Sequence, residues 1–172
     1  MMQSKMMVGG LAALTALALA CGGGGDDGES DAGSADSAAK AVGLKQAARD
    51  GKFEFVVSGI KCGVPSVGPS GYGEKAQGEF CLVSVSVKNI GKEAQTFSGS
   101  SQKAFDSAGT EFSNDTGAEI YANEGAPTFL EEINPGNRVT GKIVFDVPKK
   151  TKLTKIELHD SPFSDGVTVN LS

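Results

Sequence analysis

The sequence has no tryptophan and only one histidine, three cysteines and two tyrosines in 172 residues. With no histidine near the two downstream cysteines, a tetrahedral zinc set cannot be assembled from them. Acidic residues outnumber basic ones, and the formal net charge is −5. Nucleic-acid binding depends on neutralising phosphates with basic side chains. The composition therefore argues against a zinc protein and against a nucleic-acid partner.

The longest apolar run lies at the N-terminus, where residues 6–20 follow Lys5 without a charge. A membrane-spanning helix needs ~20 apolar residues, whereas a shorter run that ends in small residues is typical of a cleavable export signal. Leu17–Cys21, read LALAC, resembles the lipobox of bacterial lipoproteins, with Ala18 and Leu19 in swapped order. We therefore predict a signal peptide over residues 1–20 and lipidation of Cys21. Secretion after Ala20 without a lipid is the alternative.

Residues 21–42 change abruptly to glycine, serine and acidic residues. Such a segment cannot offset the entropy of ordering itself. We predict a flexible tether with a span of roughly 25 Å that holds a folded domain, residues 43–172, away from the membrane. The expected location is the cell membrane, lipid-anchored, on the extracytoplasmic side.

Two cysteines, Cys62 and Cys81, remain once Cys21 is assigned to the lipid. An even pair in an oxidising compartment predicts a disulfide. A bridge would contribute roughly 3 kcal/mol on the chain-entropy model. Two buried free thiols are the alternative.

The remainder of the chain has the period of β-strands. Cys81, Val83, Val85 and Val87 alternate with polar residues, which is typical of a half-buried strand. Similar alternation occurs in four further segments, with apolar positions at Phe53, Phe55 and Val57; Val139, Ile143, Phe145 and Val147; Ile156 and Leu158; and Val167, Val169 and Leu171. Turn signals such as Asn134–Asn137 separate them. No long stretch of the domain has helical spacing. These features predict an all-β fold, an antiparallel Ig-like β-sandwich of about seven to eight strands.

Several short motifs in this order resemble a domain-of-unknown-function family of exported, often lipid-anchored bacterial proteins, similar in fold to a secreted mycobacterial immunoprotective antigen. They are Asp50–Val57, Phe80–Gly91, Gln95–Phe97, Asn134–Gly136, Val144–Pro148, Leu158–Asp160 and Phe163–Val167. The resemblance covers about residues 42 to 172. It implies an Ig-like fold and an exported location, and it brings no catalytic residues.

No residue set indicates catalysis. His159 stands beside Asp160, but no serine has the G-x-S-x-G setting of an activated nucleophile. Gly68–Lys75 is glycine-rich, yet it lacks the Gly-Lys-Ser/Thr ending of a phosphate loop. We expect no enzyme activity, no cofactor and no metal. The open alternative is a Ca²⁺ site among loop residues 113–124, from Asn114, Asp115, Glu119 and Glu124, although their spacing fits no EF-hand.

Two function classes remain. The first is a lipid-anchored interaction domain that binds a protein in the envelope through exposed loops. In it, Tyr72 in the predicted loop 63–79 is the candidate contact, since Gly71 and Gly73 cannot cover its ring. The second is a small-ligand or Ca²⁺-binding accessory protein, which a pocket lined by Tyr121 and Phe129 would favour. The oligomeric state stays open.

Overall fold

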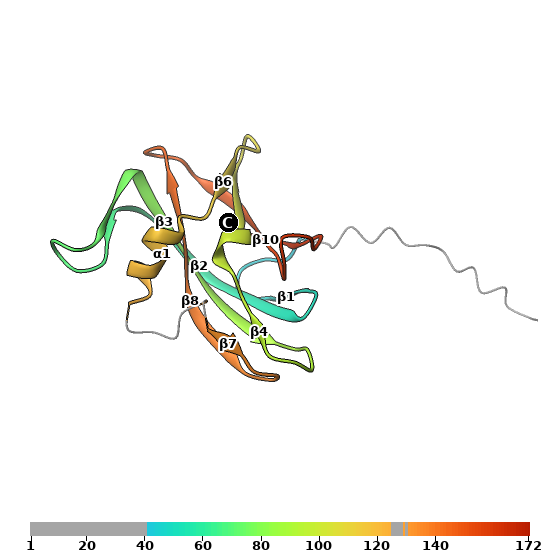
Figure 1. Cartoon of the computed structure of the whole chain (residues 1–172). Coiled ribbons are helices and arrows are strands. Elements are labelled where there is room, and N and C mark those ends of the chain that lie inside the picture. Colours follow the sequence, from blue (N-terminus) through green and yellow to red (C-terminus); the bar gives the residue numbers. More distant parts are fainter. Residues whose placement is uncertain (1–40, 125–128, 130) are drawn as a thin grey trace, which may run out of the picture. The chain divides into compact units, whose positions relative to one another are not determined.

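The computed structural model (Figure 1) describes residues 41–124, 129 and 131–172. The predicted signal peptide, Cys21 and most of the predicted tether lie outside the described residues. In the described part no helix is long and apolar enough to cross a membrane. The elements are β1 (Ala47–Asp50), β2 (Phe53–Val67), β3 (Glu74–Asn89), β4 (Gln95–Thr96), the 3-10 helix η1 (Gly99–Ser101), β5 (Lys103–Asp106), β6 (Glu111–Ser113), α1 (Thr116–Ala122), β7 (Glu132–Ile133), β8 (Arg138–Val147), β9 (Leu153–Leu158) and β10 (Val167–Asn170).

Two four-stranded sheets make up the domain, and all of their strand pairs are antiparallel. One sheet has the order β1-β2-β3-β8 and the other β10-β9-β5-β6, while β4 and β7 form a small separate pair. Apolar side chains from both four-stranded sheets share one buried cluster. The predicted antiparallel β-sandwich is therefore confirmed.

The core follows the predicted alternation closely. Val83, Val85 and Val87 of β3 are fully buried, and their inward partners include Phe55 on β2, opposite Val87, and Ile143 on β8, opposite Val83. Leu158 and Val169 enter the same cluster from the second sheet. Because side chains of a strand point alternately to its two faces, one buried face forces this period of two.

Phenylalanines occupy one end of the core. Phe97 contacts Phe53 with ring centroids 5.9 Å apart and Phe129 with centroids 4.8 Å apart, both edge-on. Gly141 of β8 leaves room for the Phe129 ring, since a Cβ at that position would lie 2.7 Å from Phe129 Cζ. Phe129 is thus a core residue rather than the pocket residue that the sequence suggested.

A short helix, α1, was not predicted. Asp115 is its N-cap, with the side chain accepting a hydrogen bond from the Ala118 N–H at 3.0 Å. The helix covers the outer face of the first sheet, where Phe80 and Val144 are fully buried in a second apolar cluster with Ala118. The strand pattern therefore breaks at Phe80 and Val144 because the sheet is covered on both faces there.

The segment 63–79 was predicted to be a loop, and this prediction is wrong for most of it. Strand β2 continues to Val67 and β3 begins at Glu74, so most of this segment is a long hairpin, drawn in teal and green as the arm that projects from the sandwich (Figure 1). Register shifts flank Val64, and Pro65 lies at one of them, where its lack of an N–H costs no ladder hydrogen bond. The glycine- and proline-rich composition hid a paired but irregular strand.

Candidate functional site

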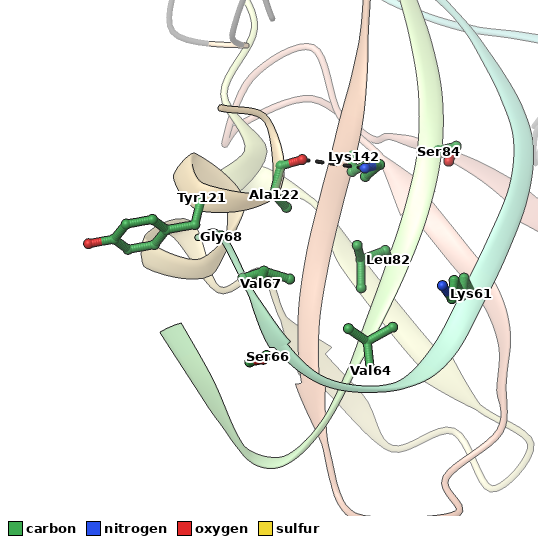
Figure 2. Close-up of a pocket in the computed structure, with 10 residues that line it drawn as sticks. All are labelled: Lys61, Val64, Ser66, Val67, Gly68, Leu82, Ser84, Tyr121, Ala122 and Lys142. Carbon is green, nitrogen blue, oxygen red and sulfur yellow. Dashed lines mark hydrogen bonds between the residues drawn. The ribbon is translucent and has the colours of Figure 1, made fainter. Parts of the chain in front are cut away.

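A groove lies on the outer face of the first sheet, beside α1 and the base of the β2–β3 hairpin (Figure 2). Its volume is about 320 Å³, near the lower end of the range for small-molecule pockets. Strand β3 forms the floor with Leu82 and Ser84. The wall residues come from β2, the turn that follows it, β8 and α1: Lys61, Val64, Ser66, Val67, Gly68, Tyr121, Ala122 and Lys142.

The register of the sheet explains this arrangement. Lys61 of β2 pairs with Leu82, and Lys142 of β8 pairs with Ser84, so the two lysines flank the central strand on its outer face. Figure 2 shows Val67, Ala122 and Tyr121 on one side of the groove and Ser84 and Lys61 on the other. The groove thus combines apolar side chains from α1, β2 and β3 with Lys61 and Ser84 on the side away from α1 and Lys142 beside Ala122.

The lining of the groove contains two lysines and no acidic residue. Within the described residues, neither Lys61 nor Lys142 belongs to an ion pair. Lys142 Nζ donates to the Ala122 carbonyl, at 3.4 Å, near the C-terminal end of α1. The groove is therefore locally cationic in a chain whose net charge is negative.

The other end of the same face contains an ion-paired carboxylate. Glu54 of β2 accepts from Arg49 at 2.7 Å and lies 3.8 Å from Arg138. The hydrogen bond from Arg49, together with the nearby charges of Arg49, Lys88 and Arg138, holds the pKa of Glu54 below its ordinary value. The groove end differs from this end because its lining contains no acidic residue.

Tyr72, the predicted contact residue, lies at the tip of the hairpin and is 83% exposed. The Tyr72 and Gly73 N–H groups both donate to the Pro69 carbonyl, at 3.1 and 2.9 Å, so the tip is a hydrogen-bonded turn. Gly71 adopts a φ of 91°, a backbone conformation that residues other than glycine rarely adopt. The structure thus presents the ring on an ordered turn, and Tyr72 does not enter the groove.

A disulfide joins Cys62 of β2 to Cys81 of β3 at the base of the same hairpin. Cys81 is fully buried in the core, whereas Cys62 is exposed. The bridge thus ties the projecting arm to the sandwich, directly beside Lys61.

Two of the three carboxylates considered for Ca²⁺ have structural roles, whereas Glu124 is exposed. Asp115 caps α1, and Glu119 is only 6% exposed, accepting from Asn114 Nδ2 at 2.5 Å. Burial raises the pKa of Glu119 to about 7, partly opposed by the hydrogen bond from Asn114. Across the described ranges of the chain there is no group of three or more His, Cys, Asp and Glu side chains that could hold a metal ion.

His159 follows β9, as expected for a residue at the end of a strand. Its N–H donates to Gln102 Oε1 at 2.7 Å, and its Nδ1 lies 3.1 Å from the Ser164 carbonyl. Asp160 uses its own N–H to donate to Asp50 Oδ2 at 2.6 Å. These contacts join loops at the end of the sandwich, and none pairs the imidazole with a side-chain hydroxyl.

Sequence reasoning missed the groove, because its two lysines lie on strands far apart in the chain. The one usable signal was Asp115 followed by Thr116 and Glu119, which is compatible with a helix start. Of the two aromatics proposed for a pocket, Tyr121 does line the groove, whereas Phe129 is in the core.

Two facing antiparallel sheets and a disulfide make this an Ig-like β-sandwich protein of the kind found in oxidising, extracytoplasmic compartments. The chain belongs to the family described as "Domain of unknown function (DUF4352)", whose model matches residues 42–168. The expected family resemblance is thereby confirmed. No curated protein matches the chain.

Solved structures of low sequence identity share the fold. The yjhA protein of Bacillus subtilis is 14% identical, with a TM-score of 0.58 over 76% of this chain and 99% of its own. The secreted protein MPT63 of Mycobacterium tuberculosis is 17% identical, with a TM-score of 0.56 over 77% of this chain and 98% of its own. The ycdA protein of Bacillus subtilis, described as a candidate lipoprotein, is 17% identical, with a TM-score of 0.50 over 73% of this chain and 38% of its own.

Proposed function

We propose that this chain is a lipid-anchored protein of the cell envelope whose β-sandwich acts as a non-catalytic binding module on the extracytoplasmic side of the membrane. The observation that carries the proposal is the projecting β2–β3 hairpin, which is tied to the sandwich by a disulfide and ends in an exposed tyrosine. An ordered loop on a rigid scaffold loses little conformational entropy when it binds a partner. A protein partner in the envelope fits this surface.

The proposed organisation follows from the sequence. Residues 1–20 direct export, Cys21 carries the lipid, residues up to 42 form the tether, and residues 43–172 form the binding domain. Two acyl chains on one residue would anchor the domain stably, whereas one would hold it only marginally. Similarity to the secreted MPT63 and to the candidate lipoprotein ycdA supports export.

Substitution of the proposed lipidation residue tests the anchor. Cys21→Ser removes the acyl acceptor, so we expect the protein to leave the membrane fraction or to remain unprocessed. Fractionation of cells followed by mass measurement of the mature chain reads both results. A Cys21→Ser protein that matures to the same mass and stays wholly with membranes would refute lipid anchoring.

Substitution of the hairpin tip tests the contact surface. If Tyr72 is an anchor residue, Tyr72→Ala should cost about 2 kcal/mol or more of binding energy, which is roughly thirtyfold in affinity. The thermal stability should hardly change, because the ring is 83% exposed and supports no core contact. Crosslinking and capture of a partner from membranes that carry the anchored protein provide the measurement.

Phe163 offers a matched control for that experiment. It is 96% exposed in the loop between β9 and β10, so Phe163→Ala removes an equally exposed aromatic ring from a different loop. We expect Phe163→Ala to capture the partner as the wild type does. If the Tyr72→Ala variant captures as much partner as the wild type does, the hairpin is a spacer and not a contact surface.

The second candidate function, binding of a small ligand, is favoured by one specific observation. The groove beside α1 combines an apolar wall with two lysines that have no acidic partner among the described residues. A concave apolar surface with a few convergent polar groups is the usual form of a small-molecule site.

A further inference from the structure

We propose that the groove formed by β2, β3, β8 and α1 binds a small anionic amphiphile, namely a carboxylate carried on a short hydrocarbon chain. The inference rests on the groove alone, and it requires neither lipidation of Cys21 nor a contact through Tyr72. Three features of the groove point to this ligand: the charge of the lining, the placement of the lysines and the apolar wall.

The charge of the lining selects an anion. Lys61 and Lys142 are both exposed, and no acidic side chain lines the groove. An adjoining hollow shares Ser84, Ala122 and Lys142, and Glu124 is the one acid in its lining. Lys142 thus lines both the groove and the adjoining hollow, whereas Lys61 lines the groove alone of these two. An incoming carboxylate would meet two ammonium groups and no carboxylate within the groove itself.

The placement of the lysines suits one compact anion. Neighbouring strands lie about 4.8 Å apart, so the Lys61 and Lys142 backbones are separated by roughly 10 Å across β3. Their flexible four-carbon stems can bring both ammonium groups over Ser84, whose hydroxyl is a further donor. Lysine interacts as a point charge and makes no demand for a planar, bidentate partner.

The apolar wall selects a chain rather than a bare ion. Val64 and Leu82 are half-buried, Val67 is buried, and all three border the groove with Ala122 (Figure 2). Leu82 and Val64 pack against the apolar cluster beneath α1, so the wall is continuous with a core. A hydrocarbon chain lying there would remove apolar surface from water, which is favourable by about 25 cal/mol per Å². The volume of about 320 Å³ suits a short chain.

Octanoate is the probe for this site. The full chain carrying Cys21→Ser is titrated with octanoate and, in parallel, with acetate, inorganic phosphate and octanol, and binding is followed by calorimetry and by amide chemical shifts. We expect saturable octanoate binding with shifts at Val64, Leu82 and Lys142. Acetate and phosphate lack the chain and octanol lacks the charge, so each should bind at least tenfold more weakly.

Lysine substitutions locate the binding. Lys61→Gln with Lys142→Gln should weaken octanoate binding at least tenfold. The control is Lys88→Gln, compared with Lys61→Gln and Lys142→Gln made singly, because each of the three removes one positive charge from the same face of the sheet and Lys88 lies at the end that holds Glu54. The octanoate affinity of the control should lie within twofold of that of the protein with all its lysines. Thermal unfolding of each variant checks that the fold is retained. We expect unchanged unfolding temperatures, because both groove lysines are exposed.

Four results would overturn the proposal. If octanoate does not bind saturably, the groove is not a binding site for such a ligand. If acetate or phosphate binds as tightly as octanoate, the groove is a simple anion site. Equal affinity for octanol shows an apolar site without charge selection. Equal weakening by Lys88→Gln shows general attraction to a basic face. None of these bears on membrane release by Cys21→Ser or on partner capture through Tyr72, so the proposals fail separately.

Discussion

Between pH 4 and pH 8 the contribution of Glu119 to the free energy of unfolding should fall by about 3 kcal/mol, because each unit of pKa difference is worth about 1.4 kcal/mol. Its pKa is raised to about 7 in the folded protein from an ordinary value of 4.5, and desolvation is the main cause. Within the described residues no lysine or arginine pairs with this carboxyl group.

The direction follows from which state holds the proton. Below pH 4.5 the carboxyl is protonated in the folded and the unfolded chain, so its contribution to stability is fully present. Between pH 4.5 and about 7 the unfolded chain releases the proton while the folded chain keeps it, and the contribution is lost progressively. Above about pH 7 both states are ionised, and the folded domain contains a buried charge.

Glu119→Gln should abolish this loss, because glutamine stays neutral and its amide oxygen can accept from Asn114 Nδ2 as the carboxyl does. Urea unfolding at pH 4 and at pH 8 measures the effect. At pH 4 the variant and the wild type should be nearly equal, which serves as the internal control. At pH 8 the variant should be more stable by about 3 kcal/mol, and an equal difference at both pH values would contradict the burial argument.

The role of Glu119 illustrates what the sequence could not reveal. In the chain it stands among Asn114, Asp115 and Glu124 and suggests an exposed cation site. The helix α1 turns its carboxyl group inward instead, against Gly99, where a Cβ would collide with the carboxylate oxygens. Whether a carboxylate is buried depends on tertiary packing, and a seven-residue helix leaves too short a pattern to predict it.

The sandwich itself was predictable, because strand alternation and turn chemistry are local properties. The valines of β3 were predicted on one face and are all buried there. Pro135–Gly136 was predicted as a turn, and Gly136 has a φ of 80° while the Asn137 N–H donates to the Asn134 carbonyl at 3.0 Å. These features need no information from distant residues.

The groove required distant information. Lys61 and Lys142 come together only through the registers that pair each strand with β3, and α1 adds Tyr121 and Ala122 to the lining from a third segment. A shift of either register by one residue would turn its lysine toward the core. Registers of non-consecutive strands such as β3 and β8 are set by packing of the whole domain, so the sequence predicted the faces but not their alignment.

Loss of the Cys62–Cys81 bridge should lower the free energy of unfolding by about 3 kcal/mol on the chain-entropy model for a closed loop of this size. The two cysteines are 19 positions apart and lie on adjacent antiparallel strands. The bridge restricts the unfolded chain, and in the folded domain it fixes the base of the hairpin. Equilibrium unfolding in urea, with and without a thiol reductant, measures the loss.

Cys62→Ala is the cleanest variant, because Cys62 is exposed while the Cys81 sulfur continues to fill its place in the core. In a Cys21→Ser background no third thiol can exchange with Cys81. We expect Cys62→Ala to equal the reduced wild type in stability and to be unaffected by reductant. A loss below about 1 kcal/mol would contradict the entropic account, since the model predicts about three times as much.

The effect should also be local. In the bridged protein the hairpin beyond Cys62 has an irregular register, with shifts between Lys61 and Val64 and between Val64 and Ser66. Without the bridge, these weakly paired residues should open more readily than the regular ladder of Val83, Val85 and Val87. Amide hydrogen exchange should therefore accelerate at Val64 and Val67 more than at Val85. Lys61 of the groove adjoins Cys62, so a local effect would extend to the groove. If exchange accelerates equally at Val64, Val67 and Val85, the disulfide stabilises the whole domain and does not specifically order the hairpin or the groove.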